Sequence, residues 1–412
     1  MIYKNYRTKP QIMNANINRL FNMGQSPSRL IIGLMSGTSV DGLDVALCRC
    51  KGFGPDTEID IIQFETVSYP DDYRQEIKSV FSKRAVDLEK VCLLNEWIAV
   101  QHANIINDCL KKWKIDPATV DLVASHGQTI YHAPKFLHGQ EKFPNATLQI
   151  GDGDHLAVKT GIITISDFRQ KHIAAGGEGA PLAVYGDFLI FSKKGENRIL
   201  LNIGGIANFT YLPGDLDGEK VFSTDTGPGN TLMDAFVQQN FSGKYFDEQS
   251  AIAGKGVINE KLLFELKKNE FFQKDFPKTT GPELFNLAYV DKANIAAGTS
   301  SIMHEDLMAT LNRFSADTIV DAIQRSSSGL TDVVVYTSGG GMHNPILMEN
   351  IRQQLPGYSF QTTDALGINP DAKEALLFAV LANEAVAGGK TEIGNGSSDI
   401  PFVSMGKISF PF

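Results

Sequence analysis

The chain has 412 residues, of which 42% are apolar and 21% are charged, as in an ordinary soluble globular protein. This length exceeds what one hydrophobic core usually holds, so it predicts two domains. Lysine and arginine number 38 against 47 aspartate and glutamate, which gives a formal net charge of −9. That balance argues against nucleic acid or an anionic membrane as the main partner. A small-molecule enzyme fits this composition better.

The sequence contains no signal for export or membrane insertion. Its four cysteines lack metal-ligand spacing, so we expect reduced thiols in a cytoplasmic protein. No apolar run approaches the length of a membrane span. Residues 1–28 are polar and lack the apolar segment of a secretory signal. We expect them to form an N-terminal tail or an overlong start, with Met23 as an alternative initiator.

Residues 31–48 predict a β-hairpin, because two short apolar runs flank a turn of small and hydroxylated residues. The turn carries Ser36, Thr38, Ser39 and one acid, Asp41, without lysine or arginine. Main-chain N–H groups of small residues bind phosphate oxygens, whereas Asp41 would repel a phosphate unless Mg²⁺ lay between them. The turn therefore indicates a metal–nucleotide site. The alternative is that Asp41-Gly42 is simply the favoured two-residue hairpin turn.

Polar residues follow two later strands of this first half. After a third strand over 59–67 and helices over 71–81 and 86–113, a buried strand over 121–125 ends in His126-Gly127-Gln128-Thr129. Open α/β sheets place ligands at such strand ends, although His126 alone also fits a turn residue bonded to the main chain. A strand over 161–166 leads into Asp167 and Arg169, which would bind a polar substrate or form an ordinary surface ion pair.

The opening pattern returns over residues 199–210, where two apolar runs flank Gly204-Gly205. A repeated glycine hairpin indicates two like domains, although two unrelated β-turns would give the same pattern. A strand over 222–224 then leads to Asp225 and a helix over 231–239, and a carboxylate at such a junction is either a general base or a plain helix N-terminal acid. Residues 255–330 are mostly helical, with a loop over 278–281.

Two further segments complete the pattern. A buried strand over 333–337 is followed by three glycines, which would let a flat group lie on the main chain. A helix over 371–387 carries Glu374 near its start.

Together these motifs resemble the superfamily of actin, hexokinase and heat-shock chaperone ATPases and, more closely, the anhydro-N-acetylmuramic acid kinase family. Eight segments occur in that family's order over roughly residues 30–408, namely 33–44, 125–129, 149–151, 167–169, 176–182, 202–205, 225–230 and 338–341. The resemblance implies an α/β fold of two ribonuclease H-like domains with an interdomain cleft. After the tail, the domains would span residues 29–165 and 166–412, and the C-terminal end could return to the first domain.

The resemblance also implies a reaction that depends on ATP and Mg²⁺. Water would open the 1,6-anhydro ring of anhydro-N-acetylmuramic acid, and O6 would be phosphorylated to give N-acetylmuramate 6-phosphate and ADP in peptidoglycan recycling. The expected partner is this small amino sugar, and a homodimer is compatible with the sequence. The alternatives are a kinase for another amino or anhydro sugar, and a non-enzymatic scaffold driven by ATP.

Individual roles follow from the same resemblance. Asp225 would be the general base, and Glu374 would help to hold the attacking water. Asp41 would lie near the Mg²⁺ ion. The expected contacts to the sugar come from Gln128, Asp167, Arg169 and Gly177. The expected contacts to ATP come from Gly37, Thr38, Ser39, Val40, Asp41, Gly42, Leu43, Asp44, Gly204, Gly205, Gly339, Gly340, Gly341 and Asn344.

Three positions depart from the family's pattern. His172 stands where the family usually has an acid, Glu178 where it has glutamine, and Pro282 where it has arginine. Losing an arginine and gaining a carboxylate would shift the sugar preference or weaken sugar binding.

Overall fold

The computed structural model describes residues 13–388, 392–394 and 400–412, and they form two compact units. Within that part of the chain, unit 1 contains residues 13–190, 371–388, 392 and 400–412, and unit 2 contains residues 191–370 and 393–394. The boundary expected at residue 165 falls within strand β6 (Ile163–Ser166) of the unit 1 sheet. A strand hydrogen-bonded inside a sheet cannot separate two domains, so the segment expected as the second domain is divided between both units.

The sheet of unit 1 has the strand order β12-β6-β4-β1-β2-β3, with β5 paired to β4. Its other strands are β1 (Ser28–Ser36), β2 (Gly42–Lys51), β3 (Glu58–Ser68), β4 (Leu122–Ala133), β5 (Ala146–Ile150) and β12 (Lys407–Ser409). Strands β1 and β2 are antiparallel, and Ser36 lies opposite Leu43. The predicted hairpin is therefore confirmed. Residues 37–41 form its loop, which excludes a two-residue turn at Asp41-Gly42.

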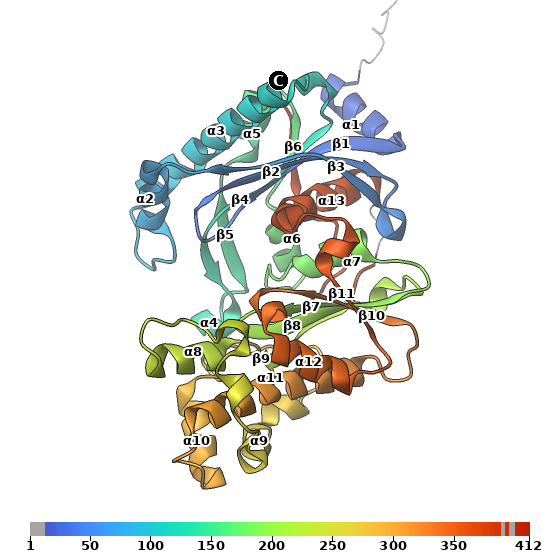
Figure 1. Cartoon of the computed structure of the whole chain (residues 1–412). Helices are drawn as coiled ribbons and strands as arrows, with labels where there is room; N and C mark the ends of the chain where they lie inside the picture. The colour runs from blue at the N-terminus through green and yellow to red at the C-terminus, as the bar shows by residue number, and fades with distance from the viewer. Residues whose placement is uncertain (1–12, 389–391, 395–399) are drawn as a thin grey trace, which may run out of the picture. The chain divides into compact units, whose positions relative to one another are not determined.

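Helices cover both faces of this sheet, with α13 on one face and α3 and α5 on the other (Figure 1). The helices of unit 1 are α1 (Ala15–Gln25), α2 (Asp71–Val80), α3 (Leu88–Trp113), α4 (Lys135–His138), α5 (Gly153–Thr160), α6 (Phe168–Ala174), α7 (Ala183–Phe191) and α13 (Lys373–Ala387). Leu94 and Ile98 of α3 pack in one core with Ile32 and Val45 of the hairpin. Leu88, the first residue of α3, is exposed and takes no part in this core.

Gly33 is required by the packing of α13 against β1. A Cβ at this position would overlap the main-chain carbonyl of Ala375 in α13. The first motif therefore begins with a glycine because a helix from the far end of the chain approaches the strand closely, and not because a ligand does.

Helix α1 changes the expectation for residues 1–28, of which residues 1–12 lie outside the described part. Asn14 caps α1 by accepting from the amides of Asn16 and Ile17, and Met23 is buried. The Asn16 side chain donates to the carbonyl of Phe412, and Arg19 donates to that of Val120. Residues 15–25 are thus a packed helix rather than a tail.

The sheet of unit 2 repeats this arrangement with the strand order β11-β10-β7-β8-β9. Its strands are β7 (Asn197–Ile203), β8 (Ile206–Leu212), β9 (Phe222–Pro228), β10 (Val333–Ser338) and β11 (Ser359–Thr362). In each unit three antiparallel strands are followed by two strands parallel to the first, as in β3-β2-β1-β4-β6 of unit 1. This is the order expected of ribonuclease H-like domains, and the prediction of two like domains is confirmed.

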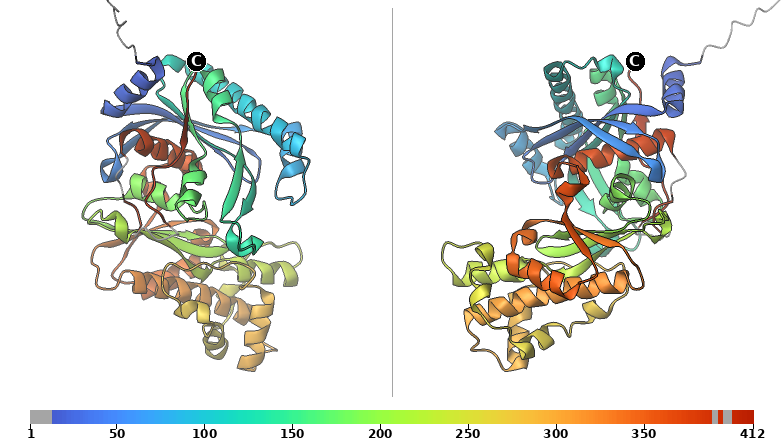
Figure 2. Two further views of the ribbon diagram at one scale, coloured as in Figure 1. Left: turned by 180° about the vertical axis from the view of Figure 1, so that it is seen from behind. Right: turned by 45° about the vertical axis from the view of Figure 1, so that its right-hand side comes forward.

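Helices α11 and α12 lie together on one face of this second sheet, as both views in Figure 2 show. The helices of unit 2 are α8 (Thr231–Asn240), α9 (Glu260–Leu266), α10 (Leu287–Ala297), α11 (His304–Ser326) and α12 (Pro345–Gln354).

Short 3-10 turns of both units lie at Gly54–Asp56, Pro117–Thr119, Gly218–Lys220, Glu248–Ser250, Ala253–Lys255, Glu270–Gln273, Gly340–His343, Thr363–Leu366 and Pro370–Ala372. Among the described helices, none is long and apolar enough to cross a membrane.

Candidate active site

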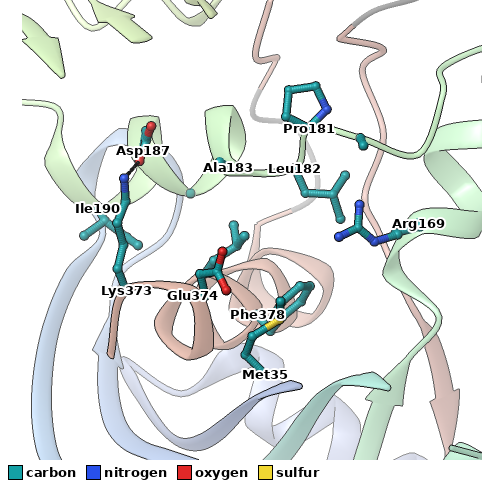
Figure 3. Close-up of a pocket in the computed structure, with 13 residues that line it drawn as sticks. Met35, Arg169, Pro181, Leu182, Ala183, Asp187, Ile190, Lys373, Glu374 and Phe378 are labelled. Atoms are coloured by element: carbon teal, nitrogen blue, oxygen red, sulfur yellow. Dashed lines mark ion pairs between the residues drawn. The ribbon is translucent and has the colours of Figure 1, made fainter. Parts of the chain in front are cut away.

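A pocket of about 260 Å³ lies within unit 1, beside α6, α7 and the start of α13. Its apolar lining includes Met35, Leu182, Ile190, Leu377 and Phe378. Its charged lining consists of Arg169, Asp187, Lys373 and Glu374. Figure 3 shows the side chains of Arg169 and Glu374 facing the same space above Phe378. The pocket therefore combines an apolar floor with a cation and an acid, which suits a polar ring with one apolar face.

Arg169 is held in place by two hydrogen bonds. Its Nε donates to Nε2 of His126 over 2.9 Å, and its Nη1 donates to the carbonyl of Gly179 over 2.6 Å. Burial lowers the pKa of Arg169, and the Glu374 carboxylate opposes that shift. An arginine stays charged in proteins, so this is a fixed cation at the pocket. Within the described residues its Nη2 donates no hydrogen bond, which leaves it for a ligand.

His126 is a site residue that the sequence left unresolved. It lies within β4, which continues to Ala133, so the expectation that this motif follows the strand is wrong. Because its Nε2 accepts from Arg169, its proton sits on Nδ1. Burial lowers the pKa of His126 to about 3, so the ring is neutral. The ring packs on Phe378 with centroids 4.8 Å apart. His126 thus fixes the direction of Arg169.

Glu374 stands at the start of α13, where it is exposed to solvent at the pocket. Partial desolvation raises the pKa of its carboxyl, Asp44 raises it further, and Arg169 and Lys373 lower it. The adjacent Lys373 pairs with Asp187 of α7 over 2.8 Å. The structure therefore brings together Arg169 and Glu374, which the sequence predicted separately.

Asp225 is the carboxylate of unit 2 that the sequence singled out. It lies inside β9, and not at a strand-to-helix junction, because β9 continues through Pro228. Its amide donates to the carbonyl of Lys278, and its Oδ2 accepts from the amide of Thr280 over 2.8 Å. Its Oδ1 accepts no hydrogen bond within the described residues. Burial raises the pKa of Asp225, Thr280 lowers it and Glu283 raises it. One oxygen is therefore oriented and the other is available as a base.

The family model of anhydro-N-acetylmuramic acid kinases matches residues 29–409. The chain belongs to the anhydro-N-acetylmuramic acid kinase family. It is therefore a kinase. The curated anhydro-N-acetylmuramic acid kinase of Pseudoalteromonas atlantica is 58% identical over 97% of this chain and 100% of its own length. The corresponding protein of Caldanaerobacter subterraneus subsp. tengcongensis is 39% identical over 95% of this chain and 100% of its own.

The segment expected to contact the phosphates of ATP is the loop between β1 and β2. Thr38, Ser39 and Asp41 are exposed there, and Oδ1 of Asp41 accepts from Oγ of Ser39 over 2.8 Å. Val40 and Leu43 are core residues, so only their main chain can face a nucleotide. Asp44 accepts from Oγ1 of Thr66, and burial raises the pKa of Asp44, helped by Asp41.

The glycine segments of unit 2 pack tightly against one another. The carbonyl of Gly204 accepts from the amide of Asn230, and a Cβ at Gly341 would overlap Ile203. Gly205, Gly339 and Gly340 are exposed. Oδ1 of Asn344 accepts from Ser250, Asn312 and the amide of Leu347, so it caps α12. Only the Nδ2 group of Asn344 is left for the expected contact with ATP.

Gln128 has a different environment from the one expected of a sugar ligand. Its side chain is fully buried in β4. Its Oε1 accepts from Oγ of Ser36 over 2.6 Å, and its Nε2 donates to the carbonyl of Gly37 over 3.1 Å. Both ends of the amide are satisfied by the protein, so Gln128 supports the loop between β1 and β2, and its expected contact with the sugar stays a prediction.

Asp167 and Gly177 do not line the pocket in which Arg169 lies. Oδ2 of Asp167 accepts from Nζ of Lys407 over 2.9 Å. Gly177 is buried, and a Cβ there would overlap the ring of His172. The expected contacts of these two residues with the sugar therefore stay predictions, and their observed partners shape the loops around the pocket.

His172, where the family usually has an acid, fits into the loop that contains Gly179. His172 is fully buried, and its Nδ1 accepts from the amide of Gly179 over 3.0 Å. Since the carbonyl of Gly179 binds Arg169, His172 helps to hold the segment that orients the cation. Pro282 is exposed, and its carbonyl accepts from the side chain of Asn286.

Lys278 is a buried cation beside the segment that binds Asp225. Its Nζ donates to the carbonyl of Phe271 over 3.1 Å and lies 5.2 Å from the centre of the Phe276 ring. Burial lowers the pKa of Lys278 from 10.5 to about 8, and Arg325 adds to the shift. The cation is stabilised by aromatic faces and main-chain carbonyls, while its own main chain holds Asp225.

We expect the free energy of unfolding to rise between about pH 8 and pH 10.5 because of Lys278. In this window the unfolded chain binds more protons than the folded chain, and stability rises with pH whenever that is so. The rise should stay below about 1.4 kcal/mol per pH unit, since screening by solvent weakens the effect. Urea unfolding of wild type and Lys278→Met at pH 7.5 and 9.5 measures it. An identical pH dependence in both proteins would contradict this assignment.

Proposed function

We propose that this chain opens the 1,6-anhydro ring of anhydro-N-acetylmuramic acid with water and transfers the γ-phosphoryl group of ATP to O6. The oxygen of water forms a bond to C1 while the C1–O6 bond breaks. The released O6 takes the phosphoryl group, and ADP leaves. The products are N-acetylmuramate 6-phosphate and ADP. The observation that carries this proposal is Asp225, a partly desolvated carboxylate with one oxygen bound by an amide and the other free.

Asp225 is proposed as the general base that takes the proton of the attacking water. A base works best when its pKa lies near the working pH, and burial moves the pKa of Asp225 upward. The amide of Thr280 orients Oδ2, so Oδ1 can receive the proton without rearrangement of the side chain. Glu374, at the pocket of unit 1, is proposed as a residue that helps to hold the attacking water through its carboxylate.

Arg169 is proposed to bind the sugar by contacting the sugar's carboxylate-bearing side group. The guanidinium fork matches a carboxylate in geometry and charge, and Arg169 has an unused Nη2 in the pocket. The apolar floor formed by Met35 and Phe378 suits a carbon face of the ring. Asp167 and Gly177 are also proposed to contact the sugar. Substitution of each residue, with measurement of the KM for the sugar, tests these contacts.

ATP is proposed to bind through the exposed main chain of the loop 37–41 and of the glycine segments of unit 2. The oxygen-rich side chains of Asp41 and Asp44 fit Mg²⁺, which prefers carboxylates together with phosphate oxygens and water. Among the described residues no three His, Cys, Asp or Glu side chains form a metal cluster, so the nucleotide would supply the remaining ligands. When bound, Mg²⁺ neutralises charge on the transferred phosphoryl group.

The test is phosphate transfer from ATP to purified anhydro-N-acetylmuramic acid in water enriched in ¹⁸O, with products read by mass spectrometry. The expected product is heavier than the sugar by one phosphoryl group and one labelled water, and its phosphate group contains no label. A phosphorylated sugar with its ring intact would contradict the water step. Consumption of ATP with no change in this sugar would favour another amino or anhydro sugar as the substrate.

A further inference from the structure

Four polar side chains form a hydrogen-bonded chain in the core of unit 1, directly below the phosphate loop. They are His102 of α3, Tyr69 after β3, Ser36 at the end of β1 and Gln128 of β4, and each is at most 3% exposed. Oη of Tyr69 lies 2.9 Å from Nε2 of His102 and 2.8 Å from Oγ of Ser36. Ser36 donates to Gln128, and Gln128 donates to the carbonyl of Gly37. We call these four residues the Tyr69 relay.

The direction of every hydrogen bond in the relay follows from its last step. The carbonyl of Gly37 can only accept, so the NH₂ group of Gln128 faces it and Oε1 faces Ser36. The hydroxyl of Ser36 donates its one proton to Gln128, so Oγ of Ser36 must accept the hydrogen bond from Tyr69. Tyr69 then has no proton left for His102, so Nε2–H of His102 donates to Tyr69. Burial lowers the pKa of His102 to about 3, in agreement with a neutral ring that donates from one nitrogen.

Tyr69 holds both ends of the phosphate loop. Its side chain binds Ser36, which precedes the loop, and its amide donates to the carbonyl of Asp41, at the end of the loop, over 3.0 Å. Between these points Val40 has a φ of +55°, a left-handed conformation that is unfavourable for a β-branched residue. Such a conformation persists only where the surroundings enforce it. The relay and the amide of Tyr69 are part of those surroundings.

The relay also determines where the loop presents its amide groups. The carbonyl of Gly37 accepts from Gln128 and from the amide of Val40, so it is directed back to the protein. A trans peptide places its N–H opposite its C=O. The amide of Thr38 therefore points away from these donors, on the side where Thr38 and Ser39 are exposed. An outward amide is what a phosphate oxygen requires.

We propose that Tyr69 and Ser36 are positioning residues for the nucleotide, acting through Gln128 on the peptide between Gly37 and Thr38. Neither side chain can touch ATP, because both are buried. Their loss weakens nucleotide binding and leaves sugar binding unchanged. The inference rests on the proposed contact of the loop 37–41 with ATP, and on the proposed reaction only for the kinetic readout, because nucleotide affinity can be measured without the sugar.

The experiment compares Tyr69→Phe with Tyr73→Phe in the full-length chain. Tyr73 is the matched control, since it stacks on Tyr69 with ring centroids 3.9 Å apart, is equally buried and has its Oη 3.1 Å from Nε2 of His102, but makes no hydrogen bond to Ser36 among the described residues. For each protein we would measure the Kd of a non-hydrolysable ATP analogue with Mg²⁺, the KM for ATP, the KM for the sugar, kcat and the thermal midpoint.

We expect Tyr69→Phe to raise the Kd and the ATP KM by about 10-fold, as the loss of one buried hydrogen bond predicts, and to change the sugar KM less than about 2-fold. Tyr73→Phe should change every binding constant by less than about 2-fold, although both variants lower the thermal midpoint. Ser36→Ala should reproduce Tyr69→Phe, and combining the two should add little, because they interrupt the same chain.

Equal effects of Tyr69→Phe and Tyr73→Phe on nucleotide affinity would overturn the proposal, as would a parallel rise in both KM values. If Tyr69→Phe does not fold, the nucleotide Kd of Ser36→Ala is compared with that of Tyr73→Phe, and the same criterion decides on the proposal. If the wild type binds the ATP analogue but leaves the sugar unmodified, the proposed function fails, while the Kd values still decide on the relay.

Discussion

Asp225→Asn is expected to lower kcat by about 10³-fold while the protein stays folded, since general base catalysis contributes about 10² to 10⁴ in rate. Asparagine keeps a carbonyl oxygen that can accept from the amide of Thr280, so the local hydrogen bond is preserved. It cannot take a proton from water. Steady-state kinetics with saturating ATP and sugar, together with thermal unfolding, measure both parts of this expectation.

The matched control is Asp217→Asn, also in unit 2. Asp217 caps a short 3-10 turn by accepting from the amide of Glu219, and asparagine caps equally well. We expect its kcat to stay within about 2-fold of the wild type. A loss of activity in Asp217→Asn as large as that in Asp225→Asn would show that the assay reports folding and not the base.

The pH dependence provides an independent check on the base. Asp225 must be deprotonated to act, so activity should rise with pH through its pKa, which lies above that of an ordinary aspartate because of burial. Glu283 raises this pKa further, so Glu283→Gln should move the acid limb of kcat/KM to lower pH. If the acid limb of kcat/KM does not move in Glu283→Gln and is still present in Asp225→Asn, a group other than Asp225 causes it.

Arg169→Met is expected to raise the KM for the sugar by about 100-fold, because a charge-assisted contact from the unused Nη2 group is lost in a partly desolvated pocket. The KM for ATP should change by less than about 2-fold. Arg169→Lys should recover only part of the loss, since lysine keeps the charge but cannot bind both His126 and Gly179 in the same geometry.

Arg49→Met serves as the control for Arg169→Met. Arg49 lies on β2 of the same unit and is exposed, so its removal should leave both KM values unchanged. Comparable increases of the sugar KM and the ATP KM in Arg169→Met would contradict a role in sugar binding. A lower thermal midpoint is expected as well, because His126 and the carbonyl of Gly179 lose their partner.

The alternation of apolar runs and glycine turns was enough to predict both hairpins, because a β-strand shows its period of two over a few residues. The order of the motifs was enough to indicate the family. Helix α3 was predicted within two residues at its start, since its apolar positions recur at helical spacing over many turns. These features depend on neighbours along the chain, which the sequence contains directly.

Local patterns failed where a residue's role depends on distant partners. His126 and Gln128 follow each other closely in β4, yet one orients Arg169 and the other holds the loop after β1. Helix α1 was taken for a tail because the groups that hold it lie elsewhere in the chain, namely the carbonyls of Phe412 and Val120, which accept from Asn16 and Arg19. The boundary at residue 165 failed because β6 pairs with β4 inside the sheet of unit 1, a pairing that no local pattern shows. The sequence identified which acidic, basic and glycine residues are candidates for the site. Which of them contact one another was decided only by the tertiary structure, because hydrogen bonds and packing join groups without regard to their separation along the chain.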